Sequence, residues 1–408
     1  RNNRRMTGTT AWRIAVVGAG PVGLALALHA ARLLPHARIT LFDARPADRD
    51  MGADPRTLAL SLGSLQFLQR LGCWPTAAAE PIREVHVSQA PPTLSGLLGE
   101  AAVRIGAQAL AVPQLGAVLS YGALVAPLQQ AWLDAAAAAP ERLATRFGAP
   151  VAALKAMPGG VEVDAGIAET FDLAVVAEGG VFADQARKAL AHDYAQTAWV
   201  GTVTLQGAPR GVAFERFTRH GPAALLPLPP LPGAGDDAAA DWRAALVWCV
   251  ARDDDPVREL TDAQRAAVLA TVFPPEAGRI VAVSPLKDFA LGLNAERTLV
   301  QGRRVRIGNA AQTLHPVAGQ GLNLGLRDAF ALVDALRWAQ DLDAALKRVE
   351  WARAPDRWGT IAVTDFLARS FTWQLPGAAG ARGLGLAALQ ALPPLRDWLA
   401  RRMMFGLR

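Results

Sequence analysis

The chain has 408 residues, of which 51% are apolar and 19% are charged, so it can bury a large core and is not disordered. Its net charge of +6 and pI near 10.0 suit an acidic partner, such as an anionic membrane surface or a phosphate-bearing cofactor. We predict no nucleic-acid partner, because the basic residues are scattered and form no stripe interleaved with aromatic residues.

The first predicted element is a buried strand over residues 12–17 that runs directly into a glycine-rich turn. The turn contains Gly18, Gly20 and Gly23, an Ala- and Leu-rich helix follows, and a second strand then ends at Asp43. The glycines permit the tight turn, the approach of a pyrophosphate and the packing of the helix, while the acid can accept from both ribose hydroxyls. This order is the dinucleotide-binding fingerprint, and it does not by itself decide between NAD and FAD.

The next predicted element is an amphipathic helix over residues 57–71, preceded by Asp54 and Arg56. Asp54 can cap this helix, and Arg56 can reach a phosphate or a carbonyl. A solvated cation at the start of the helix is the alternative for Arg56. Strand-like alternation follows over 82–87 and 101–118, interrupted by Pro91, Pro92 and Gly96, and a long helix is predicted over 121–139.

The middle of the chain is predicted to consist mainly of strands. A hairpin is expected over 151–163, and a buried strand over 171–177 ends in Glu178 and Gly179. Antiparallel strands without intervening helices are then predicted over 199–205, 211–217, 223–228 and 244–250, with a surface loop at 227–241. Such a sheet, inserted in an otherwise βαβ chain, indicates a second domain built as a ligand lid.

A second glycine-rich stretch lies at residues 305–328, after a predicted helix over 262–272 and a predicted strand over 284–291. A short strand leads into a Pro-bounded loop with Gly319, Gln320 and Gly321, and a helix then continues to about residue 338. The start of a helix carries unpaired N–H donors and partial positive charge, so this stretch is suited to bind a polar or anionic group. Two separate glycine-rich turns indicate a long ligand that is held at both ends, and FAD has that shape.

The remaining chain is predicted to be a helical tail rich in aromatic residues, with a basic pair near its end. These residues are Trp351, Trp358, Phe366, Phe371, Trp373, Trp398, Arg401 and Arg402. Ordinary packing across the nucleotide-binding domain is one interpretation. The alternative is a basic, aromatic surface that rests on lipid or on a partner protein.

These motifs together resemble the aromatic hydroxylases of the p-hydroxybenzoate hydroxylase fold. Residues 54–60 are part of this likeness. The ubiquinone-biosynthesis branch of the family, the 2-polyprenyl-6-methoxyphenol hydroxylases, is similar over residues 214–222, 246–249 and 308–321. The resemblance implies an α/β fold with a Rossmann-like FAD-binding domain of the glutathione-reductase type, an inserted mainly antiparallel β-sheet substrate domain and a helical C-terminal region. It implies an FAD-binding domain over 12–80, 120–185 and 295–345, a substrate domain over 81–119 and 186–294, and a C-terminal region over 346–408.

The sequence departs from the family pattern at two places. Glu178 stands before Gly179 where Asp is common, and Phe182 and Gln185 replace the Ser and Arg that usually follow. Glu178 adds a methylene group that must be accommodated. Asn309 stands where Asp is common but occurs in the ubiquinone branch, and it can still hydrogen-bond a ribityl hydroxyl at a loss of about a kcal/mol or two.

The resemblance implies hydroxylation of a polyprenylated phenol in ubiquinone biosynthesis. FAD would be the cofactor, NAD(P)H a transient electron donor and O2 the oxidant, acting through a flavin C4a-hydroperoxide. Other ubiquinone-biosynthesis proteins are candidate partners. Two alternatives stay open, a hydroxylase of a small soluble aromatic acid and a flavin-poor scaffold in a biosynthetic complex. The first alternative would require a closed pocket with a cationic anchor for the carboxylate.

The cofactor-binding residues that follow from these motifs are Gly18, Gly20, Gly23, Asp43, Arg56, Asn309, Gly319, Gln320, Gly321 and Asn323. The catalytic candidates are His220, Arg216 and Pro316, and no metal site is predicted. If residues 214–220 form one extended strand, Arg216 and His220 lie on one face and Glu215 on the other. One interpretation is that Arg216 or His220 faces the ring pocket, and the alternative is a surface histidine or a strand-edge arginine. His315 is expected to pack in the loop beside Pro316.

Localisation is predicted to be cytoplasmic, with peripheral contact at the inner membrane as an option. Cys73 and Cys249 are too few and too far apart for a disulfide framework, and no apolar run reaches the length of a transmembrane helix. No signal-peptide pattern opens the chain, and Met6 is a candidate natural start after residues 1–5.

Overall fold

A computed structural model describes residues 11–90, 102–179, 188–230, 241–316, 319–370 and 378–406 of the chain. Several residues named above lie outside these ranges. They are residues 1–5, Met6, Pro91, Pro92, Gly96, Phe182, Gln185, Phe371, Trp373 and residues 231–240 of the predicted loop.

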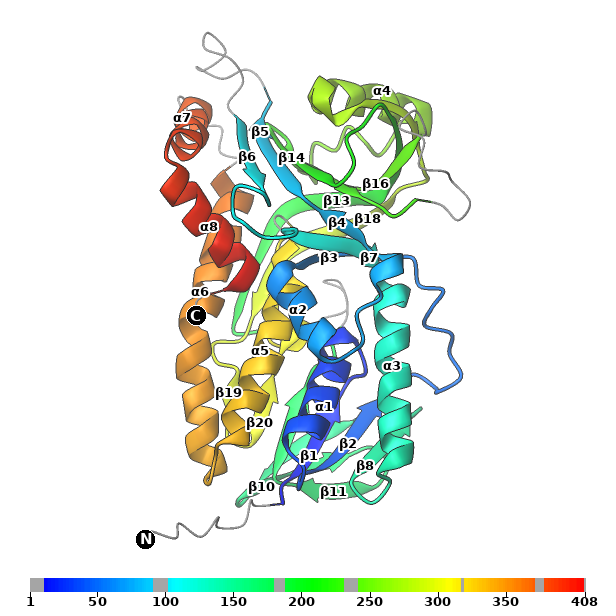
Figure 1. The fold of residues 1–408 in the computed structure, drawn as a ribbon, viewed down its shortest axis with the longest axis vertical. Coiled ribbons are helices and arrows are strands. Elements are labelled where there is room, and N and C mark those ends of the chain that lie inside the picture. Colours follow the sequence, from blue (N-terminus) through cyan, green and yellow to red (C-terminus); the bar gives the residue numbers. More distant parts are fainter. Residues whose placement is uncertain are drawn as a thin grey trace.

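A mostly parallel sheet forms the base of the molecule (Figure 1). Its strands, in spatial order, are β19 (Val300–Gln301), β20 (Arg304–Arg306), β12 (Leu173–Val176), β1 (Arg13–Val17), β2 (Arg38–Asp43) and β8 (Leu143–Phe147). All neighbours pair in parallel except β19 with β20. Alternation along β1 sends Ile14 and Val16 into one core and Ala15 into another, so both faces of the sheet are covered.

One face of this sheet is covered by helices and the other by a small antiparallel sheet. The helices α1 (Pro21–Leu33), α3 (Tyr121–Ala138) and α5 (Gln320–Arg337) share a single hydrophobic core with β1, β2 and β12. The strands β9 (Ala153–Met157), β10 (Gly160–Asp164) and β11 (Ala168–Phe171) pack on the opposite face through Val161 and Phe171. This is the Rossmann-like domain that the sequence predicted.

The upper half of the molecule in Figure 1 is a nine-stranded, mainly antiparallel sheet. Its strands are β5 (Glu84–Gln89), β6 (Ala102–Gly106), β13 (Leu190–Gln206), β14 (Val212–Thr218), β15 (Gly221–Pro227), β16 (Trp242–Ala251), β17 (Arg279–Val283), β18 (Lys287–Ala295) and β21 (Gln312–Thr313). The helix α4 (Asp262–Val272) covers its outer face. The strands β5 and β6 thus lie in one sheet with strands that come more than 80 residues later in the chain.

The helix predicted over residues 57–71 is wrong in its first part. Residues Thr57–Ser61 form the strand β3, and the helix α2 spans only Leu62–Arg70. The strand pairs with β7 (Gly116–Ser120), which also pairs with β4 (Glu80–Ile82). Pairing with a segment almost 60 residues away therefore overrides the local helical pattern. The predicted strand at 284–291 likewise begins later, at Lys287.

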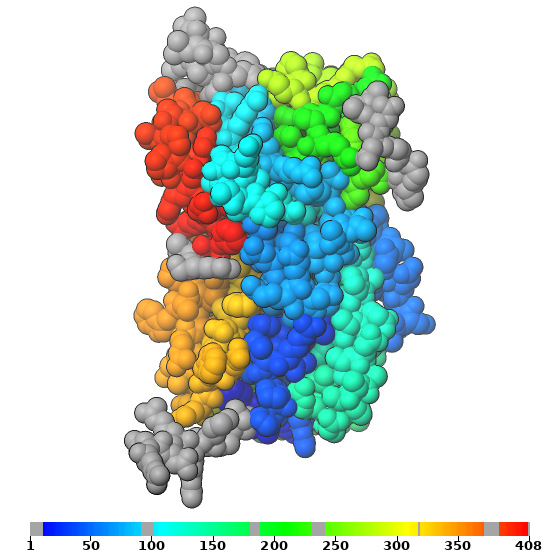
Figure 2. Space-filling model, viewed as in Figure 1, coloured from blue at the N-terminus to red at the C-terminus, as the bar shows by residue number. Residues whose placement is uncertain are grey.

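Three helices end the described chain, namely α6 (Leu342–Ser370), α7 (Ala378–Ala391) and α8 (Pro393–Phe405). Figure 2 shows α7 and α8, in red, lying against the segment around β6, in cyan. The helix α8 also packs closely on α2, since a Cβ atom added to Gly63 would lie 2.7 Å from the carbonyl oxygen of Met404. None of the helices described here combines the length and the apolar character that a membrane span requires.

Candidate functional site

The first glycine-rich turn is built around close backbone contacts. Gly18 has a φ of +103°, in the region that favours glycine, and a Cβ atom on Gly23 would lie 1.9 Å from the carbonyl oxygen of Gly18. Gly20 caps α1 without a side-chain hydrogen bond, and the first turn of α1 has no acidic residue. The amides at the start of α1 are therefore suited to an anionic ligand.

The second glycine-rich turn leads into α5 in the same way. Gly319 occupies the N-cap position with a φ of +57°, and the first turn of α5 has neither a capping side chain nor an acid. The Gly308–Ala310 turn lies beside it, with Gly308 at a φ of +60°. Here too the start of a helix is suited to a ligand with negative charge.

The two turns meet through the end of β12. A Cβ atom on Gly18 would lie 2.7 Å from the backbone nitrogen of Glu178, and one on Gly179 would lie 2.5 Å from the Cβ of Asn309. A Cβ atom on Gly325 of α5 would lie 2.8 Å from the Cα of Gly308. The structure thus places the two motifs, far apart in sequence, on either side of one narrow junction, where Glu178 is accommodated.

Asp43 is held firmly at the end of β2. Its carboxylate accepts from the Ala19 backbone N–H at 2.6 Å and from the Arg45 backbone N–H and guanidinium at 2.8 to 2.9 Å. Burial opposes ionisation, but the hydrogen bonds from Arg45 and Ala19 outweigh it and lower the pKa of Asp43. Sequence reasoning overlooked Arg45, although its position two residues after the acid was a usable signal.

Arg56 also lies near the first glycine-rich turn. It does not stand at the start of a helix, because the strand β3 follows it. Its guanidinium pairs with Asp54 at 2.7 Å and lies over the ring of Tyr121 at 4.2 Å from the centroid. Asp54 therefore does not cap a helix. A Cβ atom on Gly20 would lie 3.6 Å from the Tyr121 hydroxyl, so the tyrosine borders the first turn. The sequence analysis also missed Tyr121, which carried no local motif.

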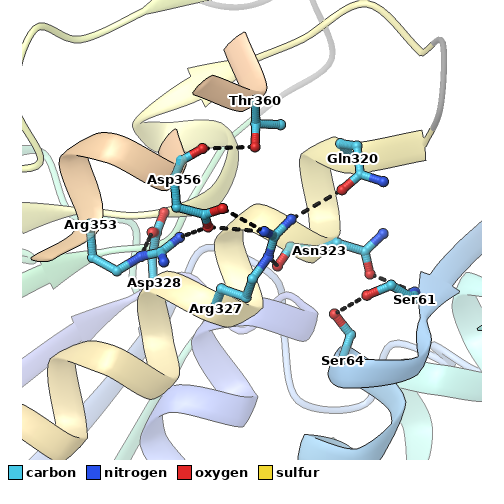
Figure 3. A network of polar contacts seen from close by, with 9 residues as sticks. All are labelled: Ser61, Ser64, Gln320, Asn323, Arg327, Asp328, Arg353, Asp356 and Thr360. Carbon is cyan, nitrogen blue, oxygen red and sulfur yellow. Dashed lines mark hydrogen bonds and ion pairs between the residues drawn. The ribbon is translucent and has the colours of Figure 1, made fainter. Parts of the chain in front are cut away.

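A network of buried charges supports the start of α5 from behind (Figure 3). Arg327 donates to Gln320 Oε1 at 3.0 Å and to both oxygens of Asp356 at 2.9 and 3.0 Å. Arg353 joins Asp356 to Asp328, at 2.7 Å to each. Because arginine has no acceptor, the Gln320 oxygen must face Arg327 and its amide N–H2 must point elsewhere.

Asn323 ties the same helix to β3. Its Oδ1 accepts from the Ser61 backbone N–H at 2.8 Å, and its Nδ2 donates to the carbonyl oxygens of Gly319 at 2.9 Å and Ala59 at 3.2 Å. Figure 3 shows Asn323 reaching from α5 toward Ser61. Asn323 therefore secures the loop entering α5, and its side chain is already committed to the protein.

A cavity of about 220 Å³ extends from the start of α5 across the inner face of the large sheet to α8. Pro316, Gly319, Gln320 and Asn323 line it at the α5 end, and Ala400, Met403 and Met404 line it at the α8 end. Between these ends the lining is mostly apolar and includes Ile82, Val85, Val87, Ile105, Ala224, Leu226 and Val247. Such a cavity suits an apolar ligand adjoining the second glycine-rich turn.

Of the catalytic candidates, only Pro316 is among the described residues that line this cavity. Arg216 is on the other face of the sheet, where it donates to the Val272 carbonyl oxygen and to Ser88 Oγ, both at 3.0 Å. The expected extended run to His220 is wrong, because β14 ends at Thr218 and His220 sits in the following turn, accepting from Arg219 Nε at 2.9 Å. Glu215 lines the cavity instead.

His315 is buried behind the cavity, as expected for a packing residue. Its Nε2 lies 3.0 Å from Gln196 Oε1, and its ring meets Tyr194 edge-on. Burial lowers the pKa of His315 to about 4, so the imidazole is neutral at pH 7. A neutral imidazole that donates to Gln196 carries its proton on Nε2.

The residues of the site fit FAD. Both helices α1 and α5 begin without an acidic cap, and the two glycine-rich stretches meet at one junction. An added Cβ atom would collide there at Gly18, Gly23, Gly179 and Gly325. An elongated dinucleotide could therefore approach the backbone at both turns, with its ring end beside the apolar cavity. No feature of the described residues obstructs this arrangement.

Comparison with known proteins agrees with this geometry. Residues 239–348 match the family model described as an FAD binding domain. The chain is 30% identical to the 3-demethoxyubiquinol 3-hydroxylase of Escherichia coli over 404 residues, covering 92% of this chain and 94% of that protein. It is 36% identical to the ubiquinone hydroxylase UbiL of Rhodospirillum rubrum over 222 residues, which are 53% of this chain and about half (49%) of that relative's length.

Solved structures share the fold at low sequence identity. The HpxO protein of Klebsiella pneumoniae, complexed with FAD and uric acid, superposes with a TM-score of 0.71 at 16% identity and covers 98% of each chain. The p-nitrophenol 4-monooxygenase PnpA of Pseudomonas putida superposes with a TM-score of 0.69 at 15% identity, covering 98% of this chain and 100% of that one. Fold, site and the full-length relative agree: the chain belongs to the family of FAD-dependent aromatic hydroxylases that includes 3-demethoxyubiquinol 3-hydroxylase.

Proposed function

We propose that this protein is an FAD-dependent monooxygenase that hydroxylates a polyprenylated phenol in ubiquinone biosynthesis. The observation that carries the proposal is the apolar cavity, which begins at the second glycine-rich turn and runs to α8. A phenol ring at the α5 end would leave an apolar tail in the part lined by Ile105, Met403 and Met404. The relatives named for ubiquinone hydroxylation support the same substrate class.

The proposed FAD-binding residues fall into two groups. At the first turn, the amides beside Gly18, Gly20 and Gly23 would hold the pyrophosphate, and Asp43 and Arg56 would contact the adenosine half. At the second turn, Asn309, Gly319, Gln320 and Gly321 would hold the flavin half, and Asn323 would contribute by securing the loop that enters α5. When bound, FAD would supply the oxidising chemistry, with electrons from NAD(P)H and oxygen from O2.

The protein's own residues would perform three tasks in this reaction. The backbone amides at the start of α5 would stabilise negative charge that develops beside them. The apolar walls, including Val85, Leu226 and Val247, would keep water from the reacting atoms. Pro316 would shape the cavity beside the ring without offering a proton donor.

The alternative of a small soluble aromatic acid has less support. That substrate would need a cationic anchor, and no Lys, Arg or His side chain is among the described residues that line the cavity. A carboxylate of the protein, Glu215, lines it instead. The described lining therefore offers no cationic side chain that would hold a carboxylate.

The face made by α7 and α8 is our candidate surface for contact with lipid at the inner membrane. A second candidate partner for this face is another ubiquinone-biosynthesis protein that presents the substrate. Leu384, Leu392, Leu395 and Trp398 are 47 to 63% exposed there, and Arg396, Arg401 and Arg402 lie on the same helix as Trp398. Because Met403 and Met404 of α8 also line the cavity, this surface adjoins the part of the cavity that would hold the apolar tail of the substrate.

Sedimentation with anionic vesicles should bring down the wild-type protein but not the Leu395→Glu/Trp398→Glu variant. Equal sedimentation of the two proteins would contradict lipid contact.

Two measurements test the enzymatic proposal. A host that lacks this protein should accumulate a prenylated phenol missing one ring hydroxyl, and the wild-type copy should restore the quinone while a Gly23→Ala copy should not. An unchanged quinone profile would contradict the proposed substrate.

The purified protein should show flavin absorbance bands, or regain them with added FAD. A protein that does neither would support the scaffold alternative.

A further inference from the structure

The helix α8 forms one end wall of the cavity and is held in place from several sides. Arg401 Nη2 donates to the carbonyl oxygen of Leu110 at 2.9 Å, which ties the helix to the chain that follows β6. At the other end of this contact region, a Cβ atom added to Gly406 would lie 2.5 Å from Arg327 Nη1 of the buried charge network. The close packing of Met404 on α2 adds a further contact. The backbone of α8 is therefore fixed relative to the cavity.

Three residues of α8 present one face of the helix to the cavity. Ala400, Met403 and Met404 stand at spacings of three and four residues, and all three line the cavity. Ala400 and Met404 are only 4% and 5% exposed, so this face is buried. Ala400 carries the smallest side chain of the three. A wall position that carries only a methyl group leaves space beside it.

The large sheet contributes a row of apolar side chains to the same part of the cavity. Ile105 of β6 pairs with Val85 of β5, which pairs with Ala213 of β14, and all three residues line the cavity. Paired residues on neighbouring strands point to the same face of a sheet. Ala213 and Ala400 also belong to one apolar cluster. The row Ile105–Val85–Ala213 and the buried face of α8 therefore bound a single apolar space.

The size of this space indicates that it is kept for a ligand. The whole cavity, about 220 Å³, is below the range of roughly 300 to 1,000 Å³ for pockets that enclose a drug-sized ligand. A phenol ring and a short part of its tail would fill it. An apolar void destabilises a protein in proportion to its volume, so a larger side chain at position 400 would favour the fold. The methyl group at this buried position therefore serves the ligand rather than the packing.

We propose that Ala400 determines the preference of the site for a prenylated phenol over an unprenylated one, because its small side chain leaves room for the tail between α8 and the row Ile105–Val85–Ala213. This inference rests on the proposed function and adds the residue that admits the tail. A larger side chain at position 400 would occupy the space of the tail without reaching the ring, which would lie at the α5 end of the cavity.

A binding experiment with two probes tests this inference without catalytic turnover. The probes are a simple phenol and the same phenol carrying a geranyl chain, titrated calorimetrically into FAD-reconstituted protein. The wild-type protein should bind the geranyl probe about a hundredfold or more tightly than the simple phenol, because each buried methylene group favours binding. Ala400→Leu should reduce this preference to about tenfold or less, while binding the simple phenol within about threefold of wild type.

Two further variants separate loss of space from a general disturbance of α8. Ala400→Val adds less volume, so it should give an intermediate preference, and it provides the same readout if the leucine variant fails to fold. Ala400→Leu/Met403→Ala removes a long side chain from the same helix face and should recover most of the wild-type preference. A side chain that only packed the helix would not be rescued in this way.

A matched control is Ala388→Leu, which adds the same side chain at an exposed position of α7 that is not among the described lining residues. It should keep the wild-type preference for the geranyl probe. If Ala400→Leu also keeps that preference while its flavin content and unfolding midpoint match wild type, the role of Ala400 is overturned and the proposed function stands. If the wild-type protein binds the two probes equally, the proposed substrate class itself is contradicted.

Discussion

The two helix starts of the site are alike in backbone but differ in what supports them. At the first, Gly18 and Gly23 make direct contact within six residues, and no side chain caps the start of α1. At the second, Gln320 and Asn323 are held by residues from α5, α6 and β3. The first therefore depends mainly on close backbone contacts, with Asp43 and Arg45 binding Ala19, whereas the second depends on side chains from three elements.

This difference determines where the site is vulnerable. A local turn fails when a Cβ atom enters it, because its contacts are already as close as atoms allow. A helix start held by a buried charge network fails when one member of the network is removed, because the remaining charges stay buried without compensation. Substitutions far from the ligand should therefore affect the second turn much more than the first.

The largest effect is expected for Arg353→Met, behind the second turn. The change leaves Asp328 and Asp356 buried without the guanidinium that bridges them, which should cost about 3 to 5 kcal/mol of stability. Urea unfolding of the apoprotein measures this change. The control Arg369→Met removes an exposed pair with Asp365 and should cost about 1 kcal/mol or less. Similar losses in the two variants would mean that the network does not support α5.

A slightly smaller effect is expected for Gly23→Ala, within the first turn. The new Cβ would lie 1.9 Å from the Gly18 carbonyl oxygen, so the backbone must move, at a cost of about 3 kcal/mol. FAD affinity should fall about a hundredfold, measured by flavin fluorescence titration. Gly106→Ala, where no heavy atom lies within 4 Å of the added Cβ, is the control and should retain wild-type affinity.

The pH dependence of stability tests the burial of His315, next to the second turn. Its pKa of about 4 lies below the ordinary value of 6.5, so its contribution is complete above pH 6.5 and is lost as pH falls toward 4. Between pH 7 and pH 5 this loss should be about 2 kcal/mol. His315→Leu should be less stable at pH 7 but should lose about 2 kcal/mol less on acidification. The control is His36→Leu, at an exposed site. If the stability of His315→Leu falls with pH as steeply as that of this control and of the wild-type protein, the assignment is contradicted.

The smallest effects are expected at the side chains beside the first turn. Asp43→Ala removes the acceptor that holds Ala19 and Arg45, and FAD affinity should fall about tenfold. Arg56→Ala should have a weaker effect, a few-fold, because its guanidinium is largely exposed and pairs with Asp54. Flavin retention during gel filtration ranks the two. If neither variant loses flavin, both residues should be removed from the site.

Much of the fold could be predicted because its signals are local. The strand–glycine–helix order around Gly18, the alternation in β13 to β16 and the helix after Gly319 are readable from short windows. Local windows failed where a distant partner decided the structure. Residues 57–61 form a strand because β7 pairs with them, and the extended run to His220 ends early because β14 turns back into β15.

The candidate site divides in the same way. The glycines, Asp43 and the start of α5 were named from the sequence because their role depends on backbone geometry within a few residues. The sequence alone also showed that Arg216 and Glu215 lie on opposite faces of a strand. Only the tertiary structure decided that Glu215 faces the cavity, because the direction of a face depends on which elements pack on each side of the sheet. For the same reason the Arg327–Asp356–Arg353 network was invisible in the sequence, since its charges meet only when α6 packs against α5.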